Sequence, residues 1–209
     1  MLADKAAFGQ DDVEVTQTES RYDGFFKIQS LTLKHKQFAG GWGPELTREL
    51  FVRGNATCLL PYDPQQDAVV LCEQFRVGAV NIGKSPWLLE LVAGMNDPGE
   101  SPEQVAIREA EEEAGLQVKM LKPICQYFPS PGGSSEWIDL FCGLVSVAGV
   151  GGIHGLEEEG EDIRVHVLSR AEAFELVKSG EINNAASIIG LQWLELNYAQ
   201  LQQEWLTLV

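Results

Sequence analysis

Three glutamates in one short segment have the type and spacing to bind a hard metal ion. Glu109, Glu112 and Glu113 lie at positions i, i+3 and i+4, so in a helix their carboxylates share one face. Like charges at this spacing destabilise a helix by roughly 0.2–0.5 kcal/mol per pair. A helix that tolerates this repulsion is either well solvated or neutralises a cation. Clustered carboxylate oxygens suit Mg²⁺, with Mn²⁺ as the alternative, and no His or Cys set competes for a softer metal.

The segment around these glutamates, residues 94–116, predicts a helix preceded by a glycine-containing loop. Ser101 can be the N-cap, Pro102 takes the first helical position, and Gln104 completes a capping box. Gly115 supplies the C-terminal stop. A stripe of small residues would let the helix lie close against a sheet, and it consists of Ala106, Ala110 and Ala114.

Residues 94–116 resemble the Nudix box, G-x5-E-x7-R-E-U-x-E-E-x-G-U, in which U is a bulky aliphatic residue. All fixed positions fall in register, and they are Gly94, Glu100, Arg108, Glu109, Glu112, Glu113 and Gly115. If each residue type makes up about 7% of a chain, the probability of seven such matches at one starting position is on the order of 10⁻⁸. Leu116 meets the last U position, whereas Ala110 is small at the first, which bears on packing rather than on metal chemistry.

Nudix enzymes use Mg²⁺ to hydrolyse a nucleoside diphosphate linked to another group, and the resemblance implies roles for the box. Glu109 and Glu113 are expected to be metal ligands, and the carbonyl of Ala93 a further one. Glu112 is expected to be a ligand or a supporting catalytic residue. Arg108 is expected to orient a carboxylate of the box. Divalent ions neutralise a diphosphate and lower the pKa of the attacking water, so positioning and one base are left to the protein.

A second motif narrows the substrate. The sequence SPGGSSE starts with Ser130, Pro131 and Gly132 and ends at Glu136, and it is similar to a loop of the ADP-ribose pyrophosphatase branch of this family. A turn between strands is the alternative, since Pro and Gly cluster in turns. After a matched box we favour a substrate loop, in which Glu136 and Met95 line the ribose side.

The acidic residues 152–165 resemble a loop of bacterial ADP-ribose pyrophosphatases. In that loop one glutamate is the general base and another, two residues on, joins the metal shell. The match places the base on Glu159 and the ligand on Glu161, with Glu157 and Glu158 as alternatives for the base. A solvated acidic loop is the other interpretation. Loop closure could bring the base to a metal-held water.

Aromatic and basic residues nearer the N-terminus are expected to bind the nucleotide. The resemblance places Phe25 and Phe26 around adenine, with a role in a strand core as the alternative. The residues that match polar or phosphate contacts of the same branch are Arg48, Glu49, Arg53 and Arg76. A few arginines are what a protein of net charge −16 needs to hold a diphosphate.

Strands predominate in the rest of the chain. Half-buried strands are expected between residues 25 and 51, with a turn at Gly40–Gly43. More apolar strands are expected at 56–60, 68–72, 87–92, 118–127, 137–147 and 163–168, the first two forming a hairpin around a turn at residues 61–64. Two C-terminal helices are expected, one after a capping box at Ser169 and one capped by Asn183 or Asn184. This is an α+β class, and the resemblance implies the Nudix fold, a mixed-sheet α/β/α sandwich with a small N-terminal β-sheet subdomain.

Length and composition indicate how the chain is organised. It has 209 residues, 44% hydrophobic and 22% charged, which excludes fibrous and disordered classes. We predict an N-terminal strand subdomain at residues 1–53, for dimerisation and adenine binding, and a Nudix hydrolase domain at 54–209. About fifty residues are too few for a stable core. In the branch that the sequence resembles, the N-terminal strands reach a partner subunit, so a homodimer with exchanged or shared strands is expected.

Charge and cysteine usage indicate surroundings and partners. Acidic residues outnumber basic ones 31 to 15, so nucleic acid and anionic membranes are not expected partners. The first twenty or so residues are polar, are expected to fray at their start, and contain no apolar signal segment. Four scattered cysteines without a C-x-x-C pair indicate buried thiols in a reducing compartment. We therefore expect a cytoplasmic protein.

The sequence as a whole predicts Mg²⁺-dependent hydrolysis of ADP-ribose to AMP and ribose 5-phosphate. One alternative is another substrate of the family, such as a GDP-sugar, ADP-glucose or a dinucleotide. Another is a non-catalytic sensor that binds ADP-ribose, although the complete box argues against it. An acidic interaction protein without an active site would leave the register match to chance.

Overall fold

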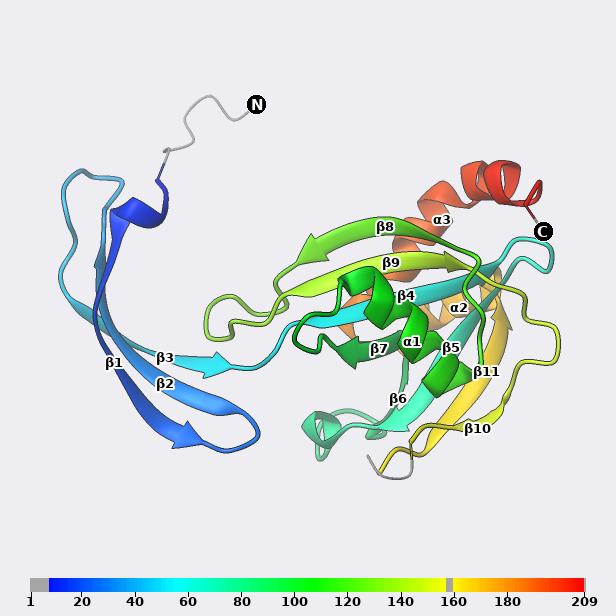
Figure 1. Ribbon diagram of the computed structural model, residues 1–209, viewed down its shortest axis with the longest axis horizontal. Coiled ribbons are helices and arrows are strands. Elements are labelled where there is room, and N and C mark those ends of the chain that lie inside the picture. The colour runs from blue at the N-terminus through cyan, green and yellow to red at the C-terminus, as the bar shows by residue number, and fades with distance from the viewer. Residues whose placement is uncertain (1–7, 157–159, 209) are drawn as a thin grey trace. The chain divides into compact units, whose positions relative to one another are not determined.

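The computed structural model describes residues 8–156 and 160–208, and the chain divides into two compact units (Figure 1). The first unit comprises Met1–Gly54 and Phe128–Glu136, and the second comprises Asn55–Tyr127 and Trp137–Val209. A loop from the middle of the chain thus belongs to the N-terminal unit. The assignment of dimerisation and adenine binding to residues 1–53 stays a prediction.

The first unit is built on a three-stranded antiparallel sheet with the order β1-β2-β3. Its elements are the short 3₁₀ helix η1 (Gln10–Asp12), β1 (Val13–Asp23), β2 (Lys27–His35) and β3 (Leu46–Val52). Gly40 and Gly41, between β2 and β3, have φ angles of +98° and +74°, which glycine adopts without strain. The turn predicted there is confirmed.

Strand β1 begins earlier than the sequence indicates. The sequence predicts strands only from residue 25, but Val13–Asp23 already form an eleven-residue strand. The expected fraying concerns the start of the chain, and residues 1–7 lie outside the described residues. Almost all of its side chains are exposed. No apolar alternation marks it, because its stability comes from backbone pairing with β2.

The loop of residues 128–136 belongs to the first unit through backbone hydrogen bonds to β3. The amide of Phe51 donates to the carbonyl of Gly133 (2.8 Å), and the amide of Ser135 donates to the carbonyl of Phe51 (3.1 Å). The predicted substrate loop is therefore fixed to the strand that carries Arg48 and Glu49.

The second unit contains a mixed sheet with the order β10-β11-β5-β4-β9-β8, to which β6 adds beside β5 and β7 beside β4. Strands β4 and β9 are parallel and the other pairs are antiparallel. The strands are β4 (Ala56–Asp63), β5 (Ala68–Phe75), β6 (Trp87–Glu90), β7 (Val92–Met95), β8 (Met120–Tyr127), β9 (Ile138–Leu144), β10 (Gly152–His154) and β11 (Ile163–Ser169), with the short 3₁₀ helix η2 (Val77–Ala79) after β5.

Two predicted boundaries are wrong. The turn between β4 and β5 lies at residues 64–67, not 61–64, because Pro61 and Tyr62 still pair with β9. The segment 87–92 is two strands rather than one, since β6 pairs with β5 and β7 pairs with β4. Leu91 lies between them, and its amide donates to Ser187 Oγ (3.1 Å).

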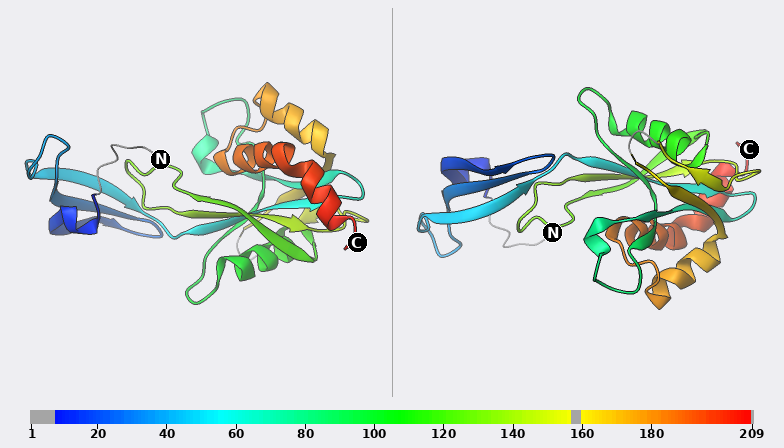
Figure 2. Two further views of the ribbon diagram at one scale, coloured as in Figure 1. Left: turned by 90° about the horizontal axis from the view of Figure 1, so that it is seen from above. Right: turned by 90° about the horizontal axis from the view of Figure 1, so that it is seen from below.

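Helices cover both faces of this sheet (Figure 2). Helix α1 (Pro102–Ala114) packs on one face, and α2 (Arg170–Ser179) and α3 (Ala185–Trp205) on the other. Successive strand residues alternate between the two layers: Leu59 joins the cluster of α1, and Leu60 joins the cluster of α3. The predicted α+β class and the mixed-sheet α/β/α sandwich are confirmed.

All four cysteines are free thiols, and three of them are buried. Among the residues that the structure describes, no helix is both long enough and apolar enough to cross a membrane.

Candidate active site

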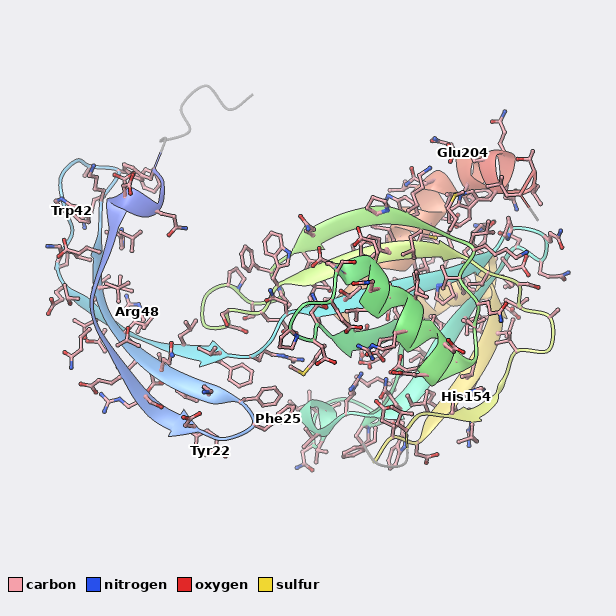
Figure 3. The ribbon with its side chains drawn as sticks, viewed as in Figure 1. Tyr22, Phe25, Trp42, Arg48, His154 and Glu204 are labelled. Carbon is pink, nitrogen blue, oxygen red and sulfur yellow. The ribbon has the colours of Figure 1, made fainter. Side chains whose placement is uncertain are left out.

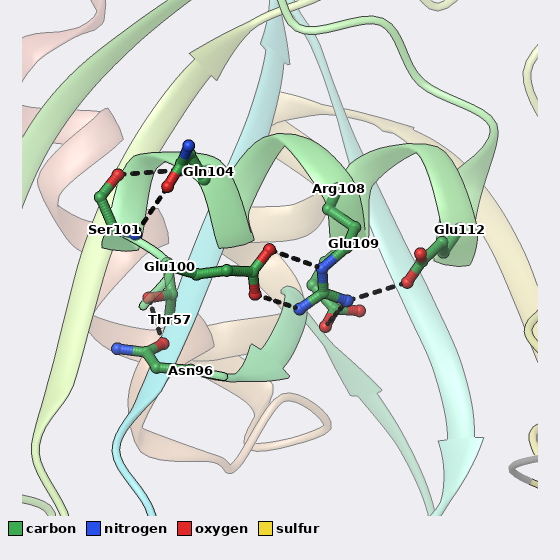
Figure 4. Close-up of polar contacts among 8 residues, drawn as sticks. All are labelled: Thr57, Asn96, Glu100, Ser101, Gln104, Arg108, Glu109 and Glu112. Carbon is green, nitrogen blue, oxygen red and sulfur yellow. Dashed lines mark hydrogen bonds and ion pairs between the residues drawn. The ribbon is translucent and has the colours of Figure 1, made fainter. Parts of the chain in front are cut away.

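Helix α1 begins and ends where its sequence predicts. Ser101 Oγ accepts a hydrogen bond from the amide of Gln104 (3.3 Å), and Gln104 Oε1 accepts one from the amide of Ser101 (2.8 Å; Figure 4). Pro102 starts the helix, and Gly115 ends it with a φ of +61°. The small-residue stripe is buried against the sheet. These contacts fix the helix along its axis and therefore fix its carboxylates.

Arg108 holds three carboxylates around α1 (Figure 4). Its Nε and Nη2 donate to the two oxygens of Glu100 (3.2 and 3.1 Å), and its Nη1 donates to Glu109 (2.8 Å) and Glu112 (3.0 Å). The planar guanidinium thereby links the loop before the helix to the helix face. This agrees with the expectation that Arg108 orients a carboxylate of the box.

Glu113 is the most deeply placed acid of the helix. Its side chain is 1% exposed, and its Oε2 accepts a hydrogen bond from the amide of Ala93 (2.9 Å). Burial raises the pKa of Glu113 to about 8, the charges of Glu109 and Glu161 add to this effect, and the Ala93 amide and Arg76 oppose it. The site therefore contains more negative charge than its own cations compensate.

Glu109 lies beside Glu113 and is also largely removed from solvent. Burial raises its pKa, and the neighbouring Arg108 partly offsets this. A Cβ on Gly94 would lie 1.7 Å from Glu109 Oε1 and 2.1 Å from its carboxyl carbon. Gly94 is thus required because any side chain there would displace the Glu109 carboxylate.

Glu161 brings a third carboxylate to the same surroundings. Its Oε2 accepts a hydrogen bond from the amide of Leu156 (3.1 Å), and its charge raises the pKa of both Glu109 and Glu113. Within residues 8–156 and 160–208, no three acidic, His or Cys side chains are already grouped tightly enough to hold a metal. The chemistry of the donors nevertheless fits a divalent cation, because they are hard oxygens, mutually repelling and short of positive charge.

Arg76 and Glu90 form an ion pair, and the sequence predicts a role for only one of the two residues. Arg76 Nε lies 2.7 Å from Glu90 Oε2, and Arg76 is close enough to lower the pKa of Glu113. The sequence prediction includes Arg76 but misses Glu90. Glu90 could have been noticed because it is the single acidic residue in the apolar segment 87–92. Met95, at the end of β7, is 38% exposed.

The predicted adenine-binding aromatics lie in the first unit, in the bend between β1 and β2 (Figure 3). Phe25 is 83% exposed, and its ring packs edge-on against Phe26 at 4.7 Å. Phe26 also packs against Phe51 at 5.1 Å, with the Arg53 guanidinium 5.4 Å from its ring centre. Phe25 is exposed and Phe26 is half-buried against β3, so the role of both rings in adenine binding stays a prediction.

The other predicted substrate residues of the first unit differ in exposure: Arg53 and Glu136 are half-buried, and the others are exposed. Arg53 forms an ion pair with Glu136 (3.2 Å), which joins β3 to the loop of residues 128–136. Arg48 and Glu49 are exposed on β3, and Arg48 Nη1 donates to the carbonyl of Thr47 (2.8 Å). Exposed positions in the loop are Ser130, Pro131 and Gly132.

The structure therefore brings the predicted residues together in two groups. In the second unit, Glu109, Glu113 and Glu161 lie within electrostatic reach of one another and of Arg76. In the first unit, Phe26, Arg53 and Glu136 form a connected set. The predicted general base, Glu159, and its alternatives Glu157 and Glu158 lie outside the described residues.

The chain belongs to the NUDIX domain family, whose model matches residues 52–204. It is 51% identical over 201 residues to an ADP-ribose pyrophosphatase of Haemophilus influenzae, covering 95% of this chain and 93% of that protein. It is 50% identical over 198 residues to an ADP-ribose pyrophosphatase of Escherichia coli strain K12, covering 95% of both. The resemblance drawn from the sequence is confirmed.

Two more distant similarities place these matches in context. A GDP-mannose pyrophosphatase of Escherichia coli O1:K1 is 37% identical over 155 residues, covering 72% of this chain and 78% of that protein. A crystal structure of an ADP compounds hydrolase superposes with a TM-score of 0.67 at 21% identity, covering 88% of this chain and 95% of that one. The latter likeness supports the fold alone.

Proposed function

We propose that this protein is a Mg²⁺-dependent hydrolase that splits ADP-ribose with water into AMP and ribose 5-phosphate. The observation that carries the proposal is the buried Glu113, fixed beneath the amide of Ala93 with Glu109 and Glu161 as charged neighbours. Such a group of carboxylates is destabilised unless a cation joins it. Two relatives that share 51% and 50% of their aligned residues with this chain are named ADP-ribose pyrophosphatase, and they favour this substrate.

The chain's own residues would divide the work of the reaction. Glu109, Glu113, Glu161 and the carbonyl of Ala93 would hold Mg²⁺, or Mn²⁺ in its place. A bound divalent ion supplies charge neutralisation and a more acidic water. Arg108 keeps Glu109 and Glu112 oriented through the contacts described above.

Two further roles concern the diphosphate and the water. Arg76 would bind the diphosphate while its phosphoanhydride bond is hydrolysed, since a guanidinium matches phosphate oxygens. Glu159, or one of the two glutamates before it, would accept the proton of the attacking water. Glu112 would support this base or the metal.

Nucleoside and ribose recognition would come from the remaining predicted residues. Phe25, which is largely exposed, is available to stack on adenine, and Phe26 would complete the aromatic contact. Polar contacts to the substrate are proposed for Arg48, Glu49 and Arg53. The ribose side would be lined by Met95 and Glu136, with the loop residues Ser130, Pro131 and Gly132 as further substrate contacts.

A homodimer is part of the proposal. In the described part of the first unit, Ser30 is the one buried side chain, so that unit has little core of its own. Strands shared with a second copy would provide the missing burial. Sedimentation equilibrium should give about twice the chain mass of 23.0 kDa, whereas a monomer across the micromolar range would contradict this part. The free thiols are compatible with the proposed cytoplasmic location.

The substrate test is a nucleotide panel with the purified protein. ADP-ribose, ADP-glucose and GDP-mannose are each incubated with Mg²⁺, with Mn²⁺ or with a chelator, and the released nucleotide is measured by chromatography. We expect AMP and ribose 5-phosphate from ADP-ribose only when metal is present. Preferential release of GMP would favour the GDP-sugar alternative, which the 37% identical relative makes specific. Tight binding of ADP-ribose without cleavage would instead indicate a sensor.

A further inference from the structure

Glu90 is a half-buried acid whose ion pair contributes little to stability. Its side chain is 15% exposed, while that of its partner Arg76 is 43% exposed. An ion pair with so accessible an arginine is worth about 0–1 kcal/mol, and burying the carboxylate has a cost of its own. Stability therefore does not explain why an acid occupies this position in an otherwise apolar strand segment.

The pair is held on both sides by backbone contacts. Glu90 lies on β6 opposite Cys72 of β5, and the amide of Arg76 donates to the carbonyl of Pro86 (2.8 Å). Arg76 follows directly after β5, so both partners start from paired strands. The backbones of both residues are therefore fixed, and the hydrogen bond from Nε to Glu90 is what restrains the Arg76 side chain.

The way in which Glu90 contacts Arg76 leaves part of the guanidinium available. Glu90 accepts the hydrogen bond from Nε. Among the described residues, the hydrogen bonds of this side chain engage Nε alone. The Nη1 and Nη2 atoms remain as a pair of donors, which is the geometry that binds two oxygens of a phosphate.

An unrestrained Arg76 would have competing partners nearby. Its charge already reaches the carboxylate of Glu113, beside which lie Glu109 and Glu161. A long, flexible side chain without Glu90 would be drawn to these acids and away from a bound anion. Glu90 thus holds Arg76 at the Nε side of its guanidinium, away from the Nη1 and Nη2 atoms.

We propose that Glu90 is a positioning residue that fixes the guanidinium of Arg76 with its Nη pair directed to the diphosphate of the substrate. This inference rests on the proposed function, because it assumes a diphosphate as ligand. Glu90 acts through Arg76 and is not itself a contact of the substrate.

The experiment compares Glu90→Ala, Glu90→Gln, Arg76→Ala and the double variant Glu90→Ala/Arg76→Ala. Two quantities are measured for each: KM and kcat for ADP-ribose with Mg²⁺, and the affinity for ADP by calorimetry. Glu90→Ala should raise KM and weaken ADP binding about tenfold, with kcat changed less than about threefold. Glu90→Gln retains an oxygen that accepts from Nε and should recover most of the affinity.

The double variant separates positioning from general damage. If Glu90 acts through Arg76, adding Glu90→Ala to Arg76→Ala should cause no further loss. Additive losses, or an unchanged ADP affinity in Glu90→Ala, would overturn the proposal. Glu73→Ala is the matched control, since Glu73 is an acid of the same sheet that pairs with His166 (2.8 Å); it should leave both quantities unchanged.

Folding and the proposed function are controlled separately. Circular dichroism verifies each variant, and Glu90→Gln keeps the test valid if Glu90→Ala does not fold. A wild-type protein that binds ADP but releases no AMP from ADP-ribose would refute the proposed function, while the ADP affinities would still decide the role of Glu90.

Discussion

The two units of the chain differ in how their side chains are buried. In the second unit, both faces of the mixed sheet carry closely packed apolar clusters beneath helices. In the described residues of the first unit, only Ser30 is buried, and rings such as Phe25 face solvent. The proposed metal ligands therefore lie in a unit with a packed core, whereas the proposed adenine contacts lie on a sheet that lacks one. Substitutions of the proposed metal ligands should therefore affect chemistry, whereas substitutions in the first unit should affect binding.

The largest effect is expected for Glu113→Gln in the packed unit. Replacing a proposed metal ligand by a neutral amide should lower kcat/KM for ADP-ribose by more than about 100-fold. The fold should persist, because the amide fills the same buried space. Steady-state kinetics measures kcat/KM, and circular dichroism verifies that the fold persists. Glu111→Gln, at an exposed position of the same helix, is the control; equal activity of both variants would remove Glu113 from the mechanism.

The buried carboxylate should also make the metal-free protein sensitive to pH. The pKa of Glu113 is about 8 in the folded protein, against 4.5 for an ordinary glutamate. The folded state therefore binds its proton more tightly, and this stability is present below about pH 4.5 and is lost as the pH rises through about 8. Urea unfolding in a chelator should show a decrease on the order of a few kcal/mol over this range. Glu113→Gln should flatten the profile, and an equally steep profile in that variant would contradict the assignment.

In the first unit, Phe25→Ala should change binding without changing stability. Because Phe25 is 83% exposed, its loss should leave the melting temperature within about one degree. Loss of a stacked base should raise KM for ADP-ribose about tenfold. Phe38→Ala is a matched control, since Phe38 is 88% exposed and has no proposed contact with substrate. The same KM in both variants would remove Phe25 from adenine binding.

The smallest effect compares one hydroxyl in each unit. Ser101→Ala removes the N-cap of α1 and should lower the free energy of unfolding by about 1 kcal/mol. Ser134 Oγ accepts from the amide of Glu136 (3.2 Å) in the loop of the first unit, and Ser134→Ala should cost less than about 0.5 kcal/mol. Denaturant unfolding measures both. The reverse order would mean that the first unit limits the stability of the chain.

Helix α1 could be predicted from the sequence almost residue by residue. Its N-cap, first-turn proline and terminal glycine are local signals, and each acts within four residues of its position. The positions of Glu109 and Glu113 on one face follow from helical periodicity alone. The strands of the second unit were also predictable in approximate place, apart from the division at Leu91 and the short strand β10, which lies in the segment expected to be an acidic loop.

The features that escaped prediction depend on partners far along the chain. Strand β1 is exposed and polar, so only its pairing with β2 marks it. The division into β6 and β7 reflects a change of partner from β5 to β4, which local alternation does not encode. The pairing of Arg76 with Glu90 joins a residue just after β5 to a residue on the neighbouring strand β6. The strand-pairing register, which local sequence patterns do not encode, determines which side chains come into contact.

The residue between β6 and β7 connects opposite sides of the second unit. Leu91 follows Glu90 directly and precedes Ala93 by two positions, and its amide is fastened to Ser187 of α3. A shift of α3 would be transmitted through this amide, and through the hydrogen bond from Asn184 Nδ2 to the carbonyl of Leu89 (2.7 Å), to the residues on either side of Leu91. Directed evolution for altered turnover should therefore recover substitutions at the rear helix, in side chains that no nucleotide ever touches.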